Sequence, residues 1–418
     1  MEKLQPKLRF SEFEGSWNKK KLNDINVSVI DGDRGSNYPN GNDFSKDGYC
    51  LFLNAKNVTK NGFSFSERTF INKEKDEKLR KGKLNRNDII LTTRGSVGHI
   101  SYYDNKIKYD NIRINSGMVI IRTDFKFINS DYLYKYFNSN QIQNEINIVA
   151  FGSAQPQLTV NEILKFKICY PSIEEQTKIA NFLSSVDEKL NLLKEKKALL
   201  EDYKKGIMQK IFNQEIRFKD DNGNDFEDWE TINLIDILKE NKTRNKNNEI
   251  TEVFSVAKSK GVINQIEHLG RSYASDNISN YKVVFENDII YTKSPTSDFP
   301  YGIVKQNKLN RKGVVSVLYG IFTPINKYVG NLLENYFSDW KNTYNYLDPI
   351  IQKGAKNTIN IGNETFLNGE KLLFPMDINE QIKISNFLIA MDNKIELVSS
   401  QIQDTQEYKK GLLQQMFV

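Results

Sequence analysis

Apolar side chains recur every three or four residues in two long stretches of the chain, one near its middle and one at its end. This spacing predicts one continuous helix in each stretch, with a single apolar stripe of the kind found in coiled coils. A helix of about 38 residues is a rod of roughly 57 Å. Such a rod is too long to bury its stripe on one small domain, so we expect each to pack against another helix. The stripe residues are Ile179, Phe182, Val186, Leu190, Leu193, Leu200, Tyr203, Ile207 and Ile211 in the first stretch and Ile384, Phe387, Met391, Ile395, Val398, Ile402, Tyr408, Leu412 and Met416 in the second.

The two stretches are copies of one another. Residues 171–212 and 376–417 align without a gap at a shift of 205, and 17 of the 42 positions are identical. Weaker matches continue upstream, where Trp17 corresponds to Trp229, so the chain is a tandem duplication. Two copies in one chain can pack about a pseudo-twofold axis, with their long helices running antiparallel. The alternative is two unrelated surface helices.

The segment ahead of each long helix has a different pattern, in which short apolar runs of β type alternate with turns rich in Gly, Asn and Asp. The first segment contains YCLFL, DIILTT, GMVIIRT and KFKICY, and the second contains YKVVF, DIIYTK, GVVSVLYGIF and KLLF. We therefore expect an α+β fold with two mixed α/β globular domains, each with a curved sheet. Two long helices that form an antiparallel coiled coil would join these domains in a pseudo-twofold internal repeat.

Composition and charge narrow the class of protein. The chain has 418 residues, 39% of them hydrophobic, which suits two or three folded domains. Its net charge of +6 and pI of about 8.8 favour a nucleic-acid partner only slightly. The opening MEKLQPKLRF lacks the apolar core of a signal peptide, and no run approaches the roughly 20 apolar residues of a membrane span. Cys50 and Cys169 stand alone, which fits a reducing compartment, so we expect a cytoplasmic protein with no membrane partner.

The sequence lacks the motifs that would indicate catalysis. It has no GxxxxGK[ST] phosphate-binding loop and no Asn/Asp-Pro-Pro-aromatic motif of amino-methyltransferases. Its two histidines, His99 and His268, make a histidine-based metal site or general base hard to assemble. We therefore expect a non-enzymatic protein with no catalytic residues and no metal site. Two alternatives stay open: a self-contained Mg-dependent nuclease, with an acidic site such as the cluster at Lys73–Asp76, and a protein-only coiled-coil adaptor.

Several phrases of the sequence resemble one protein family. They occur at the opening of each copy (PKLRFSEFEGSWNKKKLNDI and IRFKDDNGNDFEDWETINLIDI), at the helix starts (PSIEEQTKIANFLSSVDEKL and DINEQIKISNFLIAMDNKIE) and at the helix ends (LLEDYKKGIMQKIF and QEYKKGLLQQMF). NDIILTTRGSVG, in the first globular segment, is similar to a loop frequent in target-recognition domains. Together these phrases resemble the DNA specificity subunits of type I restriction–modification systems. The likeness covers the whole chain in layout, and it is specific in the helices and weak in the globular segments.

The resemblance implies a division into target-recognition domains and spacer helices. The first recognition domain would span residues 1–170, the central spacer helix 171–213, the second recognition domain 214–375 and the distal spacer helix 376–418. It also implies a bipartite double-stranded DNA target, and because the two globular segments differ, we expect its half-sites to differ and the target not to be a palindrome.

The resemblance also implies partners. Two modification subunits would supply S-adenosylmethionine and methyl transfer, and two restriction subunits would supply ATP-driven translocation and Mg-dependent cleavage, so we expect no cofactor in this chain itself. Apolar residues left exposed after the long helices pair would contact the modification subunits.

Arg94, in the TTRGSVG turn, is the residue that we most expect to contact DNA, because it lies in the loop that resembles those of target-recognition domains. Arginine can pair with guanine in the major groove. A flanking glycine lets the backbone approach the duplex closely. The second copy has TKSPTSDFPYG at this place, so its contacts need not be equivalent. For each candidate the alternative is a solvated loop side chain, and for GSAQPQL it is a turn leading into the final strand. The predicted DNA-binding residues are Arg94, Thr93, Gly95, Ser96, Lys56, Asn57, Gln155 and Gln157 in the first copy and Lys258, Lys260, Lys293 and Ser294 in the second.

Overall fold

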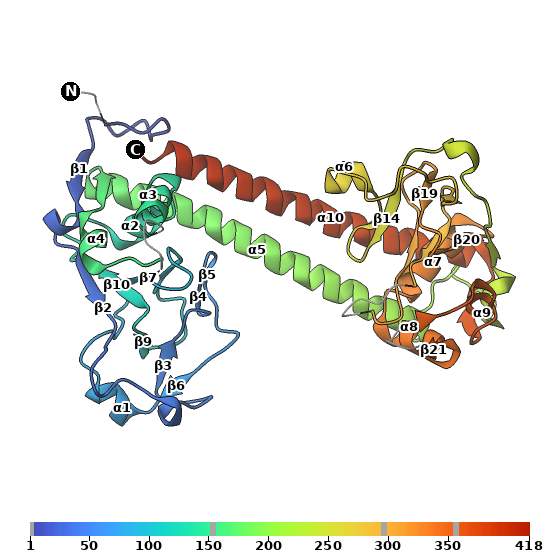
Figure 1. Ribbon diagram of the computed structural model, residues 1–418, viewed down its shortest axis with the longest axis horizontal. Coiled ribbons are helices and arrows are strands. Elements are labelled where there is room, and N and C mark those ends of the chain that lie inside the picture. The colour runs from blue at the N-terminus through green and yellow to red at the C-terminus, as the bar shows by residue number, and fades with distance from the viewer. Residues whose placement is uncertain (1–3, 151–155, 294–298, 354–358) are drawn as a thin grey trace. The chain divides into compact units, whose positions relative to one another are not determined.

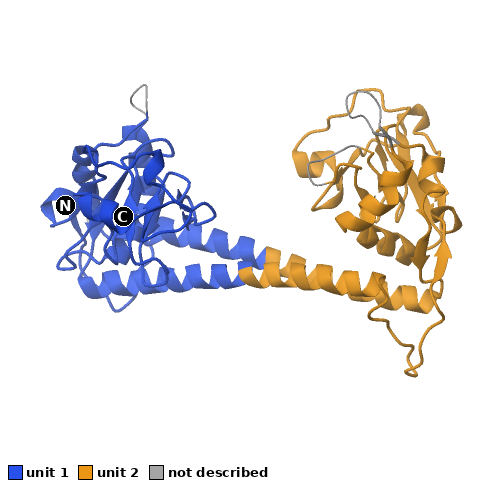
Figure 2. Ribbon diagram, turned by 90° about the horizontal axis from the view of Figure 1, so that it is seen from below, with its two compact units in different colours: residues 1–194, 400–418 blue, residues 195–399 orange. Residues whose placement is uncertain are grey.

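The computed structural model describes residues 4–150, 156–293, 299–353 and 359–418, which form two compact units (Figure 2). Unit 1 comprises residues 1–194 and 400–418, and unit 2 comprises residues 195–399. Both long helices predicted from the sequence are present, as α5 (Ile173–Phe212) and α10 (Ile378–Gln415). Each of them contributes residues to both units, so neither unit is one continuous segment of a single copy of the repeat.

Unit 1 is built on a four-stranded antiparallel sheet with the order β2-β10-β7-β8 (Figure 1). A second sheet has the order β6-β3-β9, and β1-β11 and β4-β5 form two-stranded ribbons. The strands are β1 (Asn18–Lys21), β2 (Ser28–Asp31), β3 (Cys50–Leu53), β4 (Val58–Thr59), β5 (Gly62–Phe63), β6 (Phe70–Ile71), β7 (Ile89–Thr92), β8 (Ile100–Tyr102), β9 (Ile112–Ile114), β10 (Met118–Arg122) and β11 (Lys167–Tyr170). The shorter helices are α1 (Lys73–Lys78), α2 (Ser130–Phe137), α3 (Asn140–Ala150) and α4 (Val160–Lys165), with 3-10 turns η1 (Leu22–Asp24) and η2 (Gly41–Asp43).

The central strands β7 and β10 are buried on both faces because successive side chains point to opposite sides of a sheet. The larger core of unit 1, which also takes in α2, receives Ile89, Leu91, Val119 and Ile121. The smaller core, shared with β3 and β9, receives Ile90, Met118 and Ile120. A sheet with a core on each face accounts for the uninterrupted apolar runs DIILTT and GMVIIRT.

Unit 2 repeats this plan with a four-stranded sheet of the order β13-β20-β17-β18, which pairs as β2-β10-β7-β8 does in unit 1. Its strands are β12 (Glu230–Ile232), β13 (Leu238–Glu240), β14 (Phe254–Ala257), β15 (Gly261–Asn264), β16 (Lys282–Val284), β17 (Ile289–Tyr291), β18 (Val304–Gln306), β19 (Gly313–Val315), β20 (Gly320–Pro324), β21 (Gln352–Lys353), β22 (Ile359–Asn360) and β23 (Leu372–Phe374). Its shorter helices are α6 (Gln265–Leu269), α7 (Lys327–Tyr336), α8 (Trp340–Leu347) and α9 (Asn363–Leu367), with 3-10 turns η3 (Leu234–Asp236), η4 (Lys246–Asn248) and η5 (Asp348–Ile350). The mixed α/β composition expected from the sequence is confirmed in both units.

A buried ion pair ties the start of each long helix to the chain ahead of its globular segment. In unit 1 the guanidinium of Arg9 donates to both carboxylate oxygens of Glu175, at 2.8 Å each, and the indole nitrogen of Trp17 donates to the same carboxylate at 3.3 Å. In unit 2 Arg217 donates to Glu380 at 3.3 and 3.0 Å. Because both carboxylates are buried, the repeated residues at the helix starts have a packing role, which explains their match in sequence.

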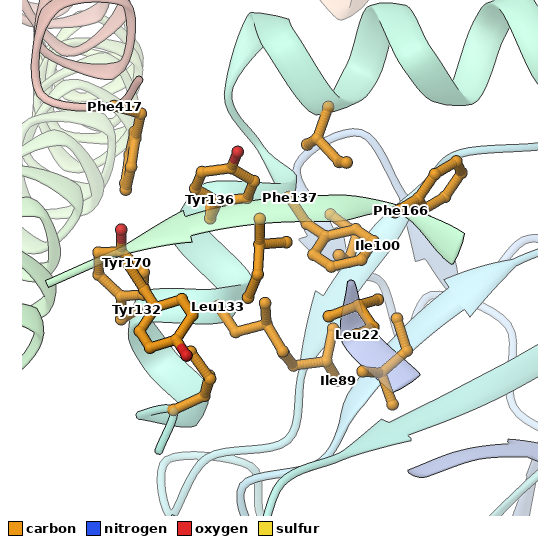
Figure 3. Packing of buried hydrophobic residues seen from close by; sticks show 14 of the residues in the cluster. Leu22, Ile89, Ile100, Tyr132, Leu133, Tyr136, Phe137, Phe166, Tyr170 and Phe417 are labelled. Atoms are coloured by element: carbon orange, nitrogen blue, oxygen red, sulfur yellow. The ribbon is translucent and has the colours of Figure 1, made fainter. Parts of the chain in front are cut away.

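The larger core of unit 1 includes residues from the far end of the chain (Figure 3). Phe417 packs against two tyrosines of α2, with its ring centroid 5.6 Å from that of Tyr132 and 5.4 Å from that of Tyr136, both edge to face. The core of unit 2 likewise includes Met208 and Ile211, from the end of α5. Each globular segment therefore buries apolar side chains that the long helix of the other copy supplies.

Two residues that the sequence placed in the apolar stripes are exposed, which corrects that assignment. Tyr203 is 54% exposed and Tyr408 is 55% exposed. In each helix the next residue, Lys204 or Lys409, lies inward and forms an ion pair of 2.6 Å with an aspartate of the other long helix. An α-helix turns every 3.6 residues rather than every 3.5, so a straight stripe drifts around the helix and the inward position passes to the lysine.

We expect Phe417→Ala to lower the free energy of unfolding of unit 1 by about 3–5 kcal/mol, the usual cost of truncating a buried phenylalanine. The matched control is Tyr408→Ala, which removes an exposed ring nearby and should change that free energy by less than about 0.5 kcal/mol. Urea unfolding of the full chain, with hydrogen exchange followed in α2, measures both variants. Equal stability of the two would show that Phe417 does not complete the core.

Candidate functional site

The turn between β7 and β8 presents the predicted Arg94 loop at the surface of unit 1. Gly95 has φ +73° and lies at the open tip, where a side chain would meet nothing within 4 Å. Gly98 has φ +87°, and a Cβ there would approach Ile146 to 3.1 Å, so both its conformation and its surroundings favour glycine. The hydroxyl of Thr92 closes the turn, because it accepts from the amide of His99 at 3.0 Å and donates to the Ser96 carbonyl.

The structure brings two of the predicted residues together, Arg94 and Gln157, which pair as a short antiparallel bridge. The backbone of Thr93 holds this arrangement, because its amide donates to Gly117 at 2.8 Å and its carbonyl accepts from the amide of Leu158 at 3.0 Å. The side chains of Arg94 and Gln157 are exposed, and in the described part of the chain no carboxylate pairs with the Arg94 guanidinium. Arg94 and Gln157 are therefore both open to a ligand.

A cavity of 280 Å³ opens between these two residues and the end of β2. Arg34 lies on its rim and donates to Asp31 at 3.1 Å and to the Ser116 carbonyl at 3.2 Å, which fixes the guanidinium. Asn161, in the first turn of α4, is exposed and also lines the cavity. The cavity thus gathers two guanidinium groups and two amide side chains, the set that hydrogen-bonds to guanine and adenine edges in a major groove. Sequence reasoning missed Arg34 and Asn161; the signal available for Arg34 was its place in the DGDRG turn.

Two other predicted residues of unit 1 have partners within the fold, one of them buried and one exposed. Asn57 is buried, and its amide donates to the carbonyls of Ser64 at 3.0 Å and Glu67 at 2.7 Å and accepts from the amide of Asn54 at 2.9 Å. These bonds use its amide to hold the loop after β3, which corrects the expectation that Asn57 contacts DNA. Lys56 is exposed, and its ammonium pairs with the Glu67 carboxylate at 2.9 Å. Gln155 lies outside the described residues, as does Ser294 in the second copy.

The structure places the described residues predicted in unit 2 on two different loops. Lys258 and Lys260 lie on the turn between β14 and β15, with the Lys258 ammonium 5.3 Å from the ring centroid of Phe299. Lys293 is half-buried instead, and its ammonium donates to the Ile361 carbonyl at 2.7 Å and to the Asn363 side chain at 2.6 Å. The pKa of Lys293 is below its ordinary value, mainly because the ammonium is partly buried and to a lesser extent because Lys282 repels it. The Lys293 ammonium thus has two partners within unit 2, and its contact with DNA stays a prediction.

The acidic cluster at Lys73–Asp76, on which the nuclease alternative was based, contains an ion-pair network that stabilises the fold. Asp76, on α1, is buried between Lys83 and Arg113. Burial alone would raise the pKa of its carboxyl, but the hydrogen bonds from Lys83 and then Arg113 outweigh burial and lower it. Over the described residues no three His, Cys, Asp or Glu side chains lie together as metal ligands would. Within the same residues, no helix has the length and apolar character needed to span a membrane.

Comparison with known proteins places this site in a family. Residues 14–202 match the model of the type I restriction modification DNA specificity domain. This part of the chain, just under half of its length, is therefore similar to the type I DNA specificity family. The match includes the Arg94 turn, the cavity beside it and most of α5, so the resemblance seen in the sequence is confirmed.

Curated relatives carry the corresponding name. The type I restriction enzyme MjaIX specificity subunit of Methanocaldococcus jannaschii is 28% identical over 163 residues, which are 36% of this chain and 35% of that protein. The MjaVIII specificity subunit of the same organism is 28% identical over 161 residues, 37% of this chain and 36% of that protein. The chain thus aligns with about a third of the length of these specificity subunits.

Solved structures of this family extend the likeness in fold to the whole chain. The S subunit of a type I restriction–modification system from M. genitalium matches with a TM-score of 0.59 and 15% identity, over 99% of both chains. A chain from a study of complex assembly and conformational transition of the type I R-M system matches with a TM-score of 0.52 and 14% identity, over 95% of this chain and 96% of that one. The fold of the specificity family therefore also covers residues beyond 202, which the family model does not reach.

Proposed function

We propose that this protein is the sequence-specific DNA-binding subunit of a type I restriction–modification complex. The observation that carries the proposal is the pairing of Arg94 with Gln157 beside an open polar cavity, inside a DNA specificity domain. Arginine binds guanine and glutamine binds adenine through paired hydrogen bonds, each worth about 1–3 kcal/mol of discrimination. The named relatives are specificity subunits, which agrees with a protein that selects DNA and leaves the chemistry to partners.

The half-sites that this protein recognises differ from each other, because the two units present different chemistry at corresponding places. The β7–β8 turn of unit 1 exposes Arg94, whereas Lys293, just after β17 of unit 2, turns inward to Asn363. A homodimer would present one surface twice and select a palindrome, but a diverged duplication selects two unlike half-sites. The target is therefore bipartite and not a palindrome.

The long helices pair antiparallel as a coiled coil. Two ion pairs support this register: Asp187 with Lys409, and Lys204 with Asp392. Along α5 the second pair lies 17 residues after the first, from Asp187 to Lys204. Along α10 it lies 17 residues before the first, from Lys409 to Asp392, as in antiparallel helices. The 205-residue shift of the repeat converts each pair into the other, as a pseudo-twofold axis requires. Two reading domains that bind one face of DNA would contact half-sites about one helical turn apart, roughly 34–36 Å.

Two modification subunits bind the outer surface of these helices. Leu192 and Leu397, at equivalent positions of the repeat, are 59% and 60% exposed, and the equivalent Tyr203 and Tyr408 are exposed as well. Exposed apolar side chains on the paired helices supply the surface for this contact. Because the same residues recur on both helices, two copies of one partner bind in the same way. These partners bring S-adenosylmethionine, and two restriction subunits bring ATP and Mg.

Methylation mapping of a genome whose host carries only this subunit and its modification partner tests the proposed function. We expect one bipartite motif with two unlike half-sites and a constant gap. Arg94→Ala is expected to relax one half-site, at a cost of about 1–3 kcal/mol, and to leave the other unchanged. A palindromic motif, or DNA cleavage by the purified chain with Mg alone, would contradict the proposal.

The partner contact has its own test. We expect Leu397→Asn to remove one of two modification subunits from the complex, and Leu192→Asn with Leu397→Asn to remove both, because each substitution puts an amide into an apolar contact. The control is Lys189→Asn with Lys394→Asn, which changes exposed residues three positions earlier on each helix. Native mass spectrometry counts the subunits. A complete complex formed by the double leucine variant would refute the contact.

A further inference from the structure

Five exposed lysines gather around the ribbon formed by β1 and β11 in unit 1. The register places Lys21 directly opposite Lys167 and Lys19 directly opposite Cys169. Lys20 lies between Lys19 and Lys21 on β1. Lys165 is the last residue of α4, two residues before β11 begins. We call this set the lysine ribbon; its members are Lys19, Lys20, Lys21, Lys165 and Lys167.

The charge of the lysine ribbon is not neutralised within the fold. In the part of the chain that the structure describes, none of its ammonium groups lies within 4.0 Å of a carboxylate. Glu145 of α3 is a nearby acid. Burial raises the pKa of its carboxyl above the ordinary value, and the attraction to Lys167, with a smaller one to Lys19, offsets only part of that rise. Like charges directly across a strand pair destabilise it, and a bound anion would relieve the repulsion between Lys21 and Lys167.

Unit 2 has the same ribbon without the excess of positive charge. Its strands β12 and β23 pair antiparallel as β1 and β11 do, and Trp229 precedes β12 as Trp17 precedes β1. The residues there are Glu-Thr-Ile on β12 and Leu-Leu-Phe on β23, with Glu370 and Lys371 just ahead of β23. The duplication therefore kept the ribbon as a structural element, and only unit 1 carries a basic surface on it.

The lysine ribbon adjoins the candidate base-reading site through one short helix. Helix α4 packs against both η1, which follows β1 directly, and β2 (Figure 1). Asn161 in its first turn lines the cavity beside Arg94, and Lys165 at its end belongs to the ribbon. Residues four apart lie on the same face of a helix, and both are exposed, so one helix face joins the two sites.

We propose that the lysine ribbon binds DNA phosphates next to the half-site that unit 1 reads, and that unit 2 has no such contact, so the protein holds its two half-sites with unequal electrostatic support. This inference rests on the proposed function. Lysines two apart on a strand are about 6–7 Å apart, so the ribbon spans two or three phosphates. Phosphate contacts position a protein on DNA without reading its sequence. Each neutralised phosphate adds about 0.9 to the slope of log affinity against log salt.

The test compares two triple variants in complex with the modification subunits, bound to target and to random duplexes at several salt concentrations and followed by fluorescence anisotropy. One is Lys19→Gln, Lys21→Gln and Lys167→Gln. The control is Lys46→Gln, Lys108→Gln and Lys126→Gln, which removes the same charge from exposed residues of unit 1 elsewhere. We expect the ribbon variant to bind both duplexes on the order of tenfold more weakly. Its slope of log affinity against log salt concentration should be smaller by about 2–3, and the control should keep the affinity and slope of the wild type.

Two further measurements locate the contact and separate the possible failures. Hydroxyl-radical footprinting of the ribbon variant should lose protection beside one half-site and keep it beside the other, and Arg in place of the three lysines should restore it. An unchanged salt slope, or a slope equal to that of the control, overturns the lysine ribbon as a phosphate contact. Loss of partner subunits with unchanged DNA affinity also overturns it, in favour of an acidic protein surface. A wild-type complex that prefers no sequence would instead overturn the proposed function itself.

Discussion

The arrangement of this protein depends on one packing constraint: the core of unit 1 is completed by residues from the other copy of the repeat. Leu412, near the end of the second long helix, and Met416 and Phe417, just after it, belong to this core, and Phe417 packs against two tyrosines of α2. In unit 2 the residues in this role are Met208 and Ile211. Because each globular segment needs apolar side chains from the other copy's helix, the two copies stabilise each other, and the ends of the long helices are constrained in sequence while the reading surfaces vary.

The sequence predicted the features that follow a simple period or an internal match. The stripes gave both long helices, and the apolar runs gave the central strands of each sheet. The prediction that Tyr203 and Tyr408 belong to the buried stripes was wrong. The next residue in each helix is a lysine that points inward and pairs with an aspartate, and the sequence does not distinguish such a lysine from a surface lysine. Similarly, Asn57 and Lys293 have side chains that suit DNA, but tertiary contacts that no local pattern shows use those side chains inside the fold.

The two units differ at the surfaces that we propose contact DNA. Unit 1 exposes Arg94 and Gln157 beside a polar cavity and carries five lysines on an adjoining ribbon, whereas the corresponding ribbon of unit 2 carries two glutamates and one lysine near its strands. The frame is shared, since both sheets pair in the same order and both long helices begin with a buried carboxylate bound to an arginine. A common frame with unlike surfaces is what an asymmetric DNA target requires.

The most direct test of this account is an exchange of residues 17–160 for the corresponding segment of another family member, with Tyr132 and Tyr136 retained so that Phe417 keeps its contacts. Methylation mapping with the same modification partner then compares the motif before and after the exchange. The account predicts that one half-site changes while the other half-site and the gap stay the same. A change in both half-sites, or in neither, would contradict the claim that each unit recognises its own half of the target.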